Sequence, residues 1–137
     1  MKTLTGGCMC GEVRFEIKNE PIVSALCHCK DCQKLSGSAF SSGLFFPKDS
    51  LHFKKNNIST YEYAGGSGAK MTRQFCKTCG TPIATIIGIF GDMCGVSSEA
   101  FDDASLCPSP STSFNMNSSK HWVTLDDAMT KHQFGAS

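Results

Sequence analysis

The sequence CHCKDC, residues 27–32, places three cysteines within six positions, with a histidine between the first two. Three thiols cannot all pair among themselves as disulfides. Cys27 and Cys29 share one side of an extended segment, and the C-x-x-C step brings Cys32 round to meet them. The triad, Cys27, Cys29 and Cys32, therefore predicts a metal site. Three protein ligands with a vacant fourth position are typical of a catalytic zinc.

The fourth position of this site is open to two interpretations on spacing alone. A substrate thiol could fill it, because zinc lowers the pKa of a bound thiol and holds it as thiolate. A remote histidine or aspartate could instead close the site. His28 would be that ligand only if the backbone turned sharply, because it points to the side opposite Cys27 and Cys29.

Two further cysteine pairs predict a second, structural site. Cys76 and Cys79 form a C-x-x-C-G pattern, which suits a zinc knuckle in which Gly80 permits the tight turn. A redox pair has the same spacing but opens a helix, and here Thr81-Pro82 and an apolar segment follow. Cys8 and Cys10, alternate residues of a glycine-rich extended segment, would complete a site of four thiolates.

Composition bounds the class of protein. The length of 137 residues fits one domain. The formal net charge of +1 gives no overall electrostatic attraction to nucleic acid. It starts without a secretory apolar core and has no run long enough to cross a bilayer. We therefore expect a cytoplasmic protein without membrane or nucleic-acid partners. Its nine cysteines, an odd count, favour metal binding or catalysis over disulfides.

The residue pattern predicts a mainly β chain. Residues 12–18 alternate between apolar and charged side chains, and strand-like segments follow at 39–46, 58–63, 82–90 and 93–98. Residues 30–37 predict a short helix that ends at Gly37. Residues 107–113, rich in serine and proline, predict a surface loop. The glycine-rich residues 64–70 favour a hairpin connection over an anion-binding loop beside the second metal.

The short basic groups, the lone cysteines, His28 and Asp31 are interpreted as structural or surface residues without a functional role. The short basic groups at Lys54-Lys55 and 70–73 are interpreted as solvated surface. The lone Cys94 and Cys107 are interpreted as small buried hydrophobes. His28 and Asp31 lie near the triad in sequence and are weak candidates for a general base, and we favour surface polar residues for both.

The three motifs together resemble a known family. GGCMCGEVRF (6–15), CHCKDCQKLSGSAF (27–40) and FCKTCGTPI (75–83) are similar, in order and spacing, to the glutathione-dependent formaldehyde-activating enzyme family, which also contains centromere protein V. The tail resembles the end of the family as well, where a turn at Asp102-Asp103 is followed by a strand and then by Trp122. The resemblance covers most of the chain, taken as one domain over 1–137.

The resemblance implies a β-tent of stacked antiparallel sheets with one or two short helices. Residue by residue, Cys8, Cys10, Cys76 and Cys79 fall on structural zinc ligands. Cys27, Cys29 and Cys32 fall on the ligands of a catalytic zinc, which is expected to be the more labile ion. The implied activity is a carbon–sulfur lyase reaction read in reverse, the joining of glutathione and formaldehyde into S-hydroxymethylglutathione.

Two departures from the family pattern bear on the substrate. Gln33 stands where arginine often follows the third triad cysteine, and Lys120-His121 precede Trp122 where arginine and proline are usual. A missing cation would weaken binding of an anionic peptide such as glutathione. The alternative hypothesis is a non-catalytic, zinc-stabilised binding module with a chromatin or protein partner. The near-neutral charge and the lack of a long basic extension count against it.

Overall fold

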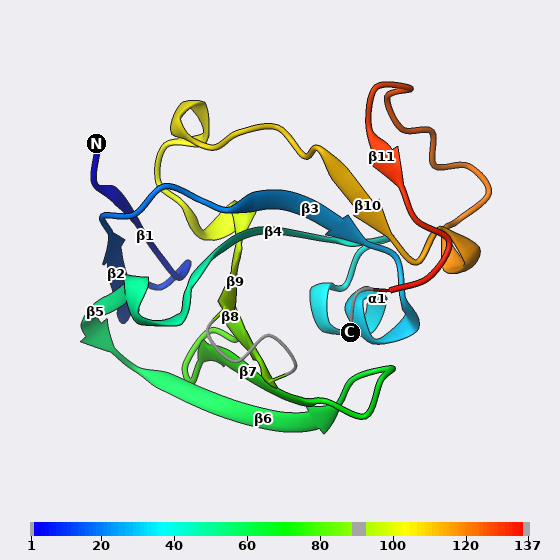
Figure 1. Cartoon of the computed structure of the whole chain (residues 1–137). Helices are drawn as coiled ribbons and strands as arrows, with labels where there is room; N and C mark the ends of the chain where they lie inside the picture. Colours follow the sequence, from blue (N-terminus) through cyan, green and yellow to red (C-terminus); the bar gives the residue numbers. More distant parts are fainter. Residues whose placement is uncertain (1, 89–92, 136–137) are drawn as a thin grey trace.

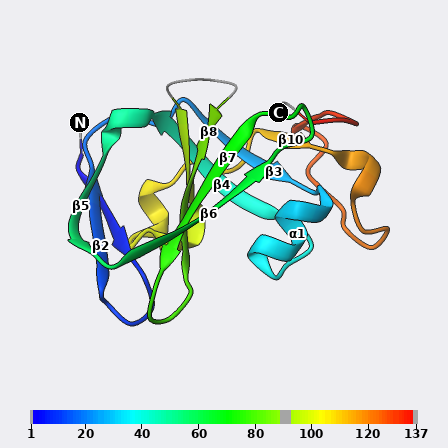
Figure 2. The same cartoon turned by 90° about the horizontal axis from the view of Figure 1, so that it is seen from below.

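A computed structural model describes residues 2–88 and 93–135 of the chain. The smaller of its two sheets has the order β1-β2-β5 and is antiparallel throughout. Its strands are β1 (Leu4–Gly7), β2 (Val13–Ile17) and β5 (Leu51–Asn56). In Figures 1 and 2 this sheet lies at the end of the molecule away from the helix.

The larger sheet has the order β11-β10-β3-β4-β9-β8-β7-β6. In chain order its strands are β3 (Val23–Cys27), β4 (Ser41–Pro47), β6 (Ile58–Ala64), β7 (Lys70–Cys76), β8 (Pro82–Ile87), β9 (Met93–Ser97), β10 (Thr112–Phe114) and β11 (Thr130–Lys131). Figure 1 shows it strongly curved, from β3 and β4 round to β6. Strand β10 runs parallel to both β3 and β11, and the other pairs are antiparallel.

The core lies between the two sheets. Strand β2 buries alternate residues, and its burial pattern follows the period of two that the sequence shows. These side chains pack on those of β4, β8 and β9. The largest fully buried side chains of the core are Val13, Phe15, Ile17, Leu44, Phe46, Ile83 and Val96. The opposite face of the larger sheet is thereby left to the helix and the cysteine triad.

The one α-helix within the described ranges, α1 (Lys30–Ser36), confirms the predicted short helix. It ends at Gly37, which has a φ of 66° and donates its N–H to the carbonyl of Gln33 at 2.9 Å. A left-handed residue at this position is the usual helix stop and favours glycine. Single 3₁₀ turns lie at Lys48–Ser50, Ser98–Ala100, Ala104–Leu106 and Met116–Ser118.

The mainly β prediction is confirmed, with differences in detail. Strands β2, β4, β6, β8 and β9 match the five predicted segments, although positions 89–90 of the fourth lie outside the described residues. The predicted loop at 107–113 is wrong at its end, because β10 begins at Thr112. Residues 64–70 form the predicted hairpin connection, closed by the N–H of Gly65 on the carbonyl of Ala69 at 2.7 Å. In the described ranges, no helix has the length and hydropathy of a membrane span.

Candidate metal centres

Four cysteines from two distant parts of the chain meet at one end of the core. Cys8 and Cys10 lie in the turn between β1 and β2, while Cys76 ends β7 and Cys79 lies in the turn before β8. Their sulfurs all lie within 4.8 Å of one another. The N–H of Met9 donates to the hydroxyl of Thr81 at 3.2 Å and joins the two turns. The structure thus brings together the four predicted residues, here called the four-cysteine cluster.

The spacing of these sulfurs fits a tetrahedral zinc ion. With Zn–S bonds of about 2.3 Å, ligand sulfurs in a tetrahedron lie about 3.8 Å apart. The sulfur of Cys10 lies 3.5 Å from that of Cys8 and 3.7 Å from that of Cys76. Gly80 has a φ of 77°, which supports the turn predicted behind the knuckle. Cys8 and Cys10 meet through a turn, so the expected extended segment was wrong there.

Backbone and side-chain donors surround the same sulfurs. Cys76 accepts N–H groups from Thr78 at 3.4 Å and Cys79 at 3.5 Å, and from the amide of Asn57 at 3.6 Å. Cys8 accepts the N–H of Val13 at 3.2 Å. Hydrogen bonds to sulfur favour the thiolate over the thiol, which is the form that binds metal. The cluster therefore has the donor set and the outer hydrogen bonds that a closed thiolate site needs.

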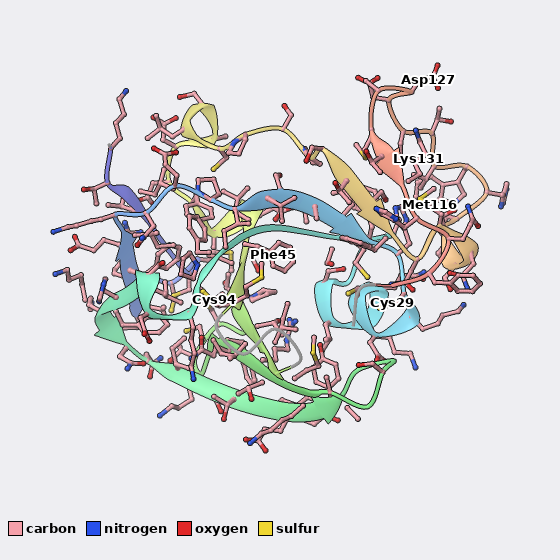
Figure 3. The ribbon with its side chains drawn as sticks, in the orientation of Figure 1. Cys29, Phe45, Cys94, Met116, Asp127 and Lys131 are labelled. Carbon is pink, nitrogen blue, oxygen red and sulfur yellow. The ribbon has the colours of Figure 1, made fainter. Side chains whose placement is uncertain are left out.

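The triad lies at the junction of β3 and α1. Cys27 is the last residue of β3, Cys29 is the N-cap of α1, and Cys32 lies in the first helical turn. Their sulfurs lie within 4.8 Å of one another, and all three residues are half-buried. The sulfur of Cys29 accepts the N–H of Cys32 at 3.3 Å. Figure 3 shows Cys29 at the helix, well apart from Cys94.

The three thiols of the triad lie close enough to shift one another's pKa values in opposite directions. Contacts with Cys27 and Cys32 lower the pKa of Cys29 well below its usual range. Contacts with Cys27 and Cys29, together with burial, raise the pKa of Cys32. The pKa of Cys27 is also raised, mainly by Cys29. One thiolate is thus held by two neighbouring thiols, and a divalent cation could replace their protons.

His28 is fully buried, which corrects its interpretation as a surface residue. Its Nε2 lies 2.9 Å from the hydroxyl of Ser113, and its ring packs on Phe40 with 5.2 Å between centroids. Nδ1 is buried and has no hydrogen-bond partner among the described residues. His28 does not join the sulfurs of the triad, in agreement with the opposite direction expected from the sequence. Asp31 is exposed, as expected.

Asn115 contacts the triad although no sequence pattern indicated it. Its Nδ2 donates to the sulfur of Cys27 at 3.2 Å. Its φ is 59°, in the left-handed region that asparagine tolerates better than most residues. Gly135 packs closely against the same amide, because a Cβ at that glycine would lie 2.8 Å from Nδ2. The parallel pairing of β10 with β3 places Asn115, the residue after β10, beside the end of β3.

Replacing Asn115 by glycine should weaken metal binding at the triad. Glycine keeps the left-handed backbone and removes only the donor to Cys27. We expect the zinc affinity of the triad to fall about 10- to 100-fold, the usual effect of losing an outer-shell partner. Competition with a chromophoric chelator would measure it. Asn117→Gly, at an exposed neighbour, is the matched control, and equal affinities for the two variants would contradict the role of Asn115.

Gln33 has a structural role at the position where the family often carries arginine. Its Nε2 donates to the carbonyl of His28 at 2.7 Å and to that of Ser118 at 3.1 Å. These bonds join α1 to the segment that supplies Asn115. A cation does lie near the triad, but it comes from β7. Arg73 is half-buried beside α1, so its interpretation as solvated surface was wrong.

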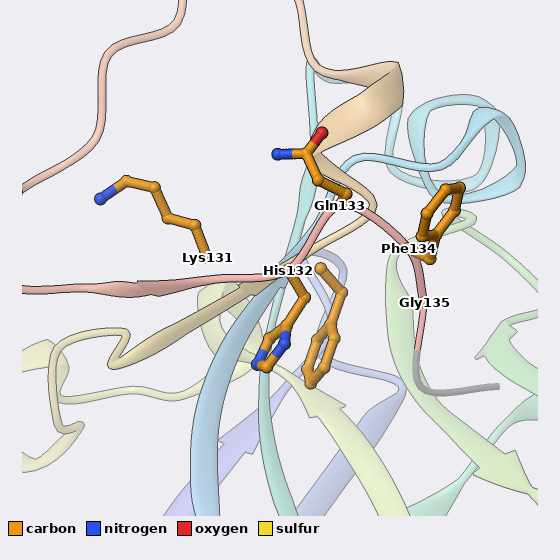
Figure 4. A pocket seen from close by; sticks show the side chains of 6 residues that line it. Lys131, His132, Gln133, Phe134 and Gly135 are labelled. Carbon is orange, nitrogen blue, oxygen red and sulfur yellow. The ribbon is translucent and has the colours of Figure 1, made fainter.

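The lone cysteines Cys94 and Cys107 belong to neither the four-cysteine cluster nor the triad. Cys94 is fully buried, as expected, and burial raises its pKa to about 11. Cys107 is only partly buried, against the edge of the core. Phe114 and residues 131–135 line an open pocket of about 530 Å³ (Figure 4), in which His132 stacks on Phe114. No cysteine lines this pocket, but Phe114 pairs with Cys27 and Gly135 packs on the amide of Asn115, so the pocket adjoins the surroundings of the triad.

Comparisons with known proteins agree with this arrangement. The family model for the glutathione-dependent formaldehyde-activating enzyme matches residues 3–118, a range that contains both cysteine groups. A crystal structure of a Rhodobacter sphaeroides protein is similar in fold, with a TM-score of 0.59 and 22% sequence identity. The similarity covers 77% of this chain and 97% of that one. No curated protein matches the sequence. The family match over most of the chain shows that this protein belongs to the glutathione-dependent formaldehyde-activating enzyme family.

Proposed function

We propose that the protein is a zinc-dependent enzyme of the carbon–sulfur lyase type, acting on a thiol or its aldehyde adduct. Its proposed reaction joins glutathione and formaldehyde into S-hydroxymethylglutathione. The observation that carries the proposal is the triad, because it offers three sulfurs and no fourth protein ligand among the described residues. Three ligands and one free position are typical of zinc sites that meet substrate.

The two cysteine groups have different proposed roles. The four-cysteine cluster provides a complete thiolate set and would hold a structural zinc. Cys27, Cys29 and Cys32 would hold the zinc that meets substrate, and Asn115 would fix the sulfur of Cys27 through its amide. When bound at the triad, zinc supplies a Lewis acid that stabilises a substrate thiolate or a developing alkoxide.

The reaction needs no redox partner. The thiol sulfur adds to the carbonyl carbon of formaldehyde, one S–C bond forms, and the C=O π bond becomes a C–O single bond. The thiol proton ends on that oxygen, so atoms and electrons balance. The protein's own contribution is to hold the two reactants together in a fixed geometry. The half-buried triad at the end of β3 supplies such a fixed position.

Exchange NMR of glutathione and formaldehyde tests the proposed reaction. The parent protein should raise the rate of S-hydroxymethylglutathione formation above the uncatalysed rate, and Cys32→Ser should return it to that rate. Cys107→Ser, at a partly buried cysteine outside both clusters, is the matched control and should keep the parent rate. Equal rates with parent protein and buffer would remove this reaction and favour the binding-module hypothesis.

A further inference from the structure

Arg73 connects the β6–β7 hairpin to α1. It lies on β7 opposite Tyr61 of β6 and Thr85 of β8. Residues paired directly across neighbouring strands point to the same face of a sheet. Thr85 pairs with Gly95 of β9, and Gly95 pairs with Phe45 of β4, so these residues share the face of Arg73. Their neighbours in sequence, Cys94 and Phe46, belong to the core, so Arg73 lies on the opposite face. There its Nη2 donates to the carbonyl of Leu35 in α1 at 2.5 Å.

The same face of α1 carries part of the triad. Leu35 follows Cys32 by three residues, so the two lie one turn apart on the same side of the helix. Burial lowers the pKa of Arg73, and its proximity to Tyr63 and Cys32 offsets part of this effect. Figures 1 and 2 both place α1 beside the hairpin that carries Arg73. The guanidinium therefore lies near the triad.

Tyr63 lies on the same face and adds a hydrogen-bond donor. It is two residues from Tyr61 on β6, and the two rings stack with 5.9 Å between centroids. Burial raises the pKa of Tyr63 to about 12, with smaller contributions from Cys32 and Asp31. At neutral pH its hydroxyl is therefore protonated and can donate. Arg73 and Tyr63 together present a positive charge and a neutral donor on the face of the larger sheet that meets α1.

The charge of Arg73 has no counter-ion in the described part of the chain. The ion pairs of that part all involve other residues: Arg14–Asp102, Lys54–Glu16, Lys55–Glu12 and Lys70–Glu62. A guanidinium has five N–H donors, and the bond to Leu35 uses one of them. A half-buried guanidinium with free donors is well suited to a planar carboxylate, which it binds through two parallel hydrogen bonds.

We infer that Arg73 and Tyr63 bind a carboxylate of the thiol substrate while its sulfur lies at the triad. This inference rests on the proposed function and narrows the substrate to thiols that carry a carboxylate. In this arrangement Arg73, from a distant strand, provides the positive charge that the family often has at the position of Gln33. The competing explanation is that Arg73 only braces α1 against the sheet.

Binding calorimetry with a charged and a neutral thiol separates these two explanations. The probes are glutathione and glutathione diethyl ester, titrated into zinc-loaded protein at the same ionic strength. The parent should bind glutathione about 10- to 100-fold more tightly than the ester, the usual range for hydrogen bonds to charged groups. Arg73→Gln should lose most of this preference while its affinity for the ester stays the same. Arg73→Lys should keep an intermediate preference, because lysine supplies a charge without the planar fork.

Lys55→Gln is the matched control, since it removes one positive charge from β5 in the other sheet. It should keep the full preference of the parent. Thermal melting and zinc content of each variant show whether folding is unchanged. Two outcomes would overturn the role of Arg73 and leave the proposed function standing. In the first, the parent prefers glutathione and Arg73→Gln keeps that preference. In the second, the parent binds both thiols equally. If the parent binds neither thiol, the proposed function fails and the inference fails with it.

Discussion

Cys79→Ser should abolish the cooperative thermal unfolding of the protein. Serine is close to cysteine in size, so the change removes a thiolate and leaves packing almost unchanged. The four-cysteine cluster joins the β1–β2 turn to the β7–β8 turn, and the other three thiolates would no longer hold zinc firmly. Zinc binding contributes about 10–16 kcal/mol in small zinc domains. That is as large as the whole stability of a typical domain, about 5–15 kcal/mol.

Circular dichroism at rising temperature, together with zinc analysis, would measure this effect. Cys29→Ser is the informative comparison, because it removes a ligand of the other group and should leave a folded protein with less metal. Cys107→Ser, outside both groups, should match the parent in both respects. If Cys79→Ser and Cys29→Ser both melt like the parent, the division into structural and catalytic sites is wrong.

The triad and each of the two pairs in the four-cysteine cluster could be predicted from the sequence because their spacing is local. C-x-x-C and C-x-C bring sulfurs together through one turn, whatever the rest of the chain does. Strand β2 could be predicted for the same reason, since one of its faces is buried and the residues alternate. Strand β3 was missed because Ser24, Ala25 and Leu26 are all buried, which removes the alternation.

The surroundings of the triad could not be predicted, because they depend on contacts between distant residues. Asn115 reaches Cys27 only through the parallel pairing of β10 with β3. Arg73 reaches α1 only because the sheet curves round to place β7 beside the helix. His28 looked like a surface residue because its partner, Ser113, lies 85 positions away in sequence. A polar residue is buried when a partner is present, and the sequence does not show which partner will be.

The zinc at the triad should be lost much more readily than the zinc at the four-cysteine cluster. The cluster offers four sulfurs, of which Cys8 and Cys76 are buried and accept several N–H groups. The triad offers three half-buried sulfurs, which stay within reach of solvent and oxidants. We therefore expect between one and two zinc ions per chain after purification, with the deficit at the triad.

Native mass spectrometry during treatment with a mild chelator would follow this loss. The species with two zinc ions should convert to a stable species with one. The Cys29→Ser variant should contain one zinc ion from the beginning. Glutathione should change the rate of the first loss, because its thiol would occupy the free position at the triad, and it should leave the remaining ion unaffected. S-Methylglutathione, which has neither a free thiol nor a disulfide, is the control and should leave the rate unchanged. A persistent species with two zinc ions, insensitive to any thiol, would mean that both sites are closed and structural. The binding-module hypothesis would then explain the protein better than catalysis, because a closed site has no position at which a substrate sulfur could meet the metal.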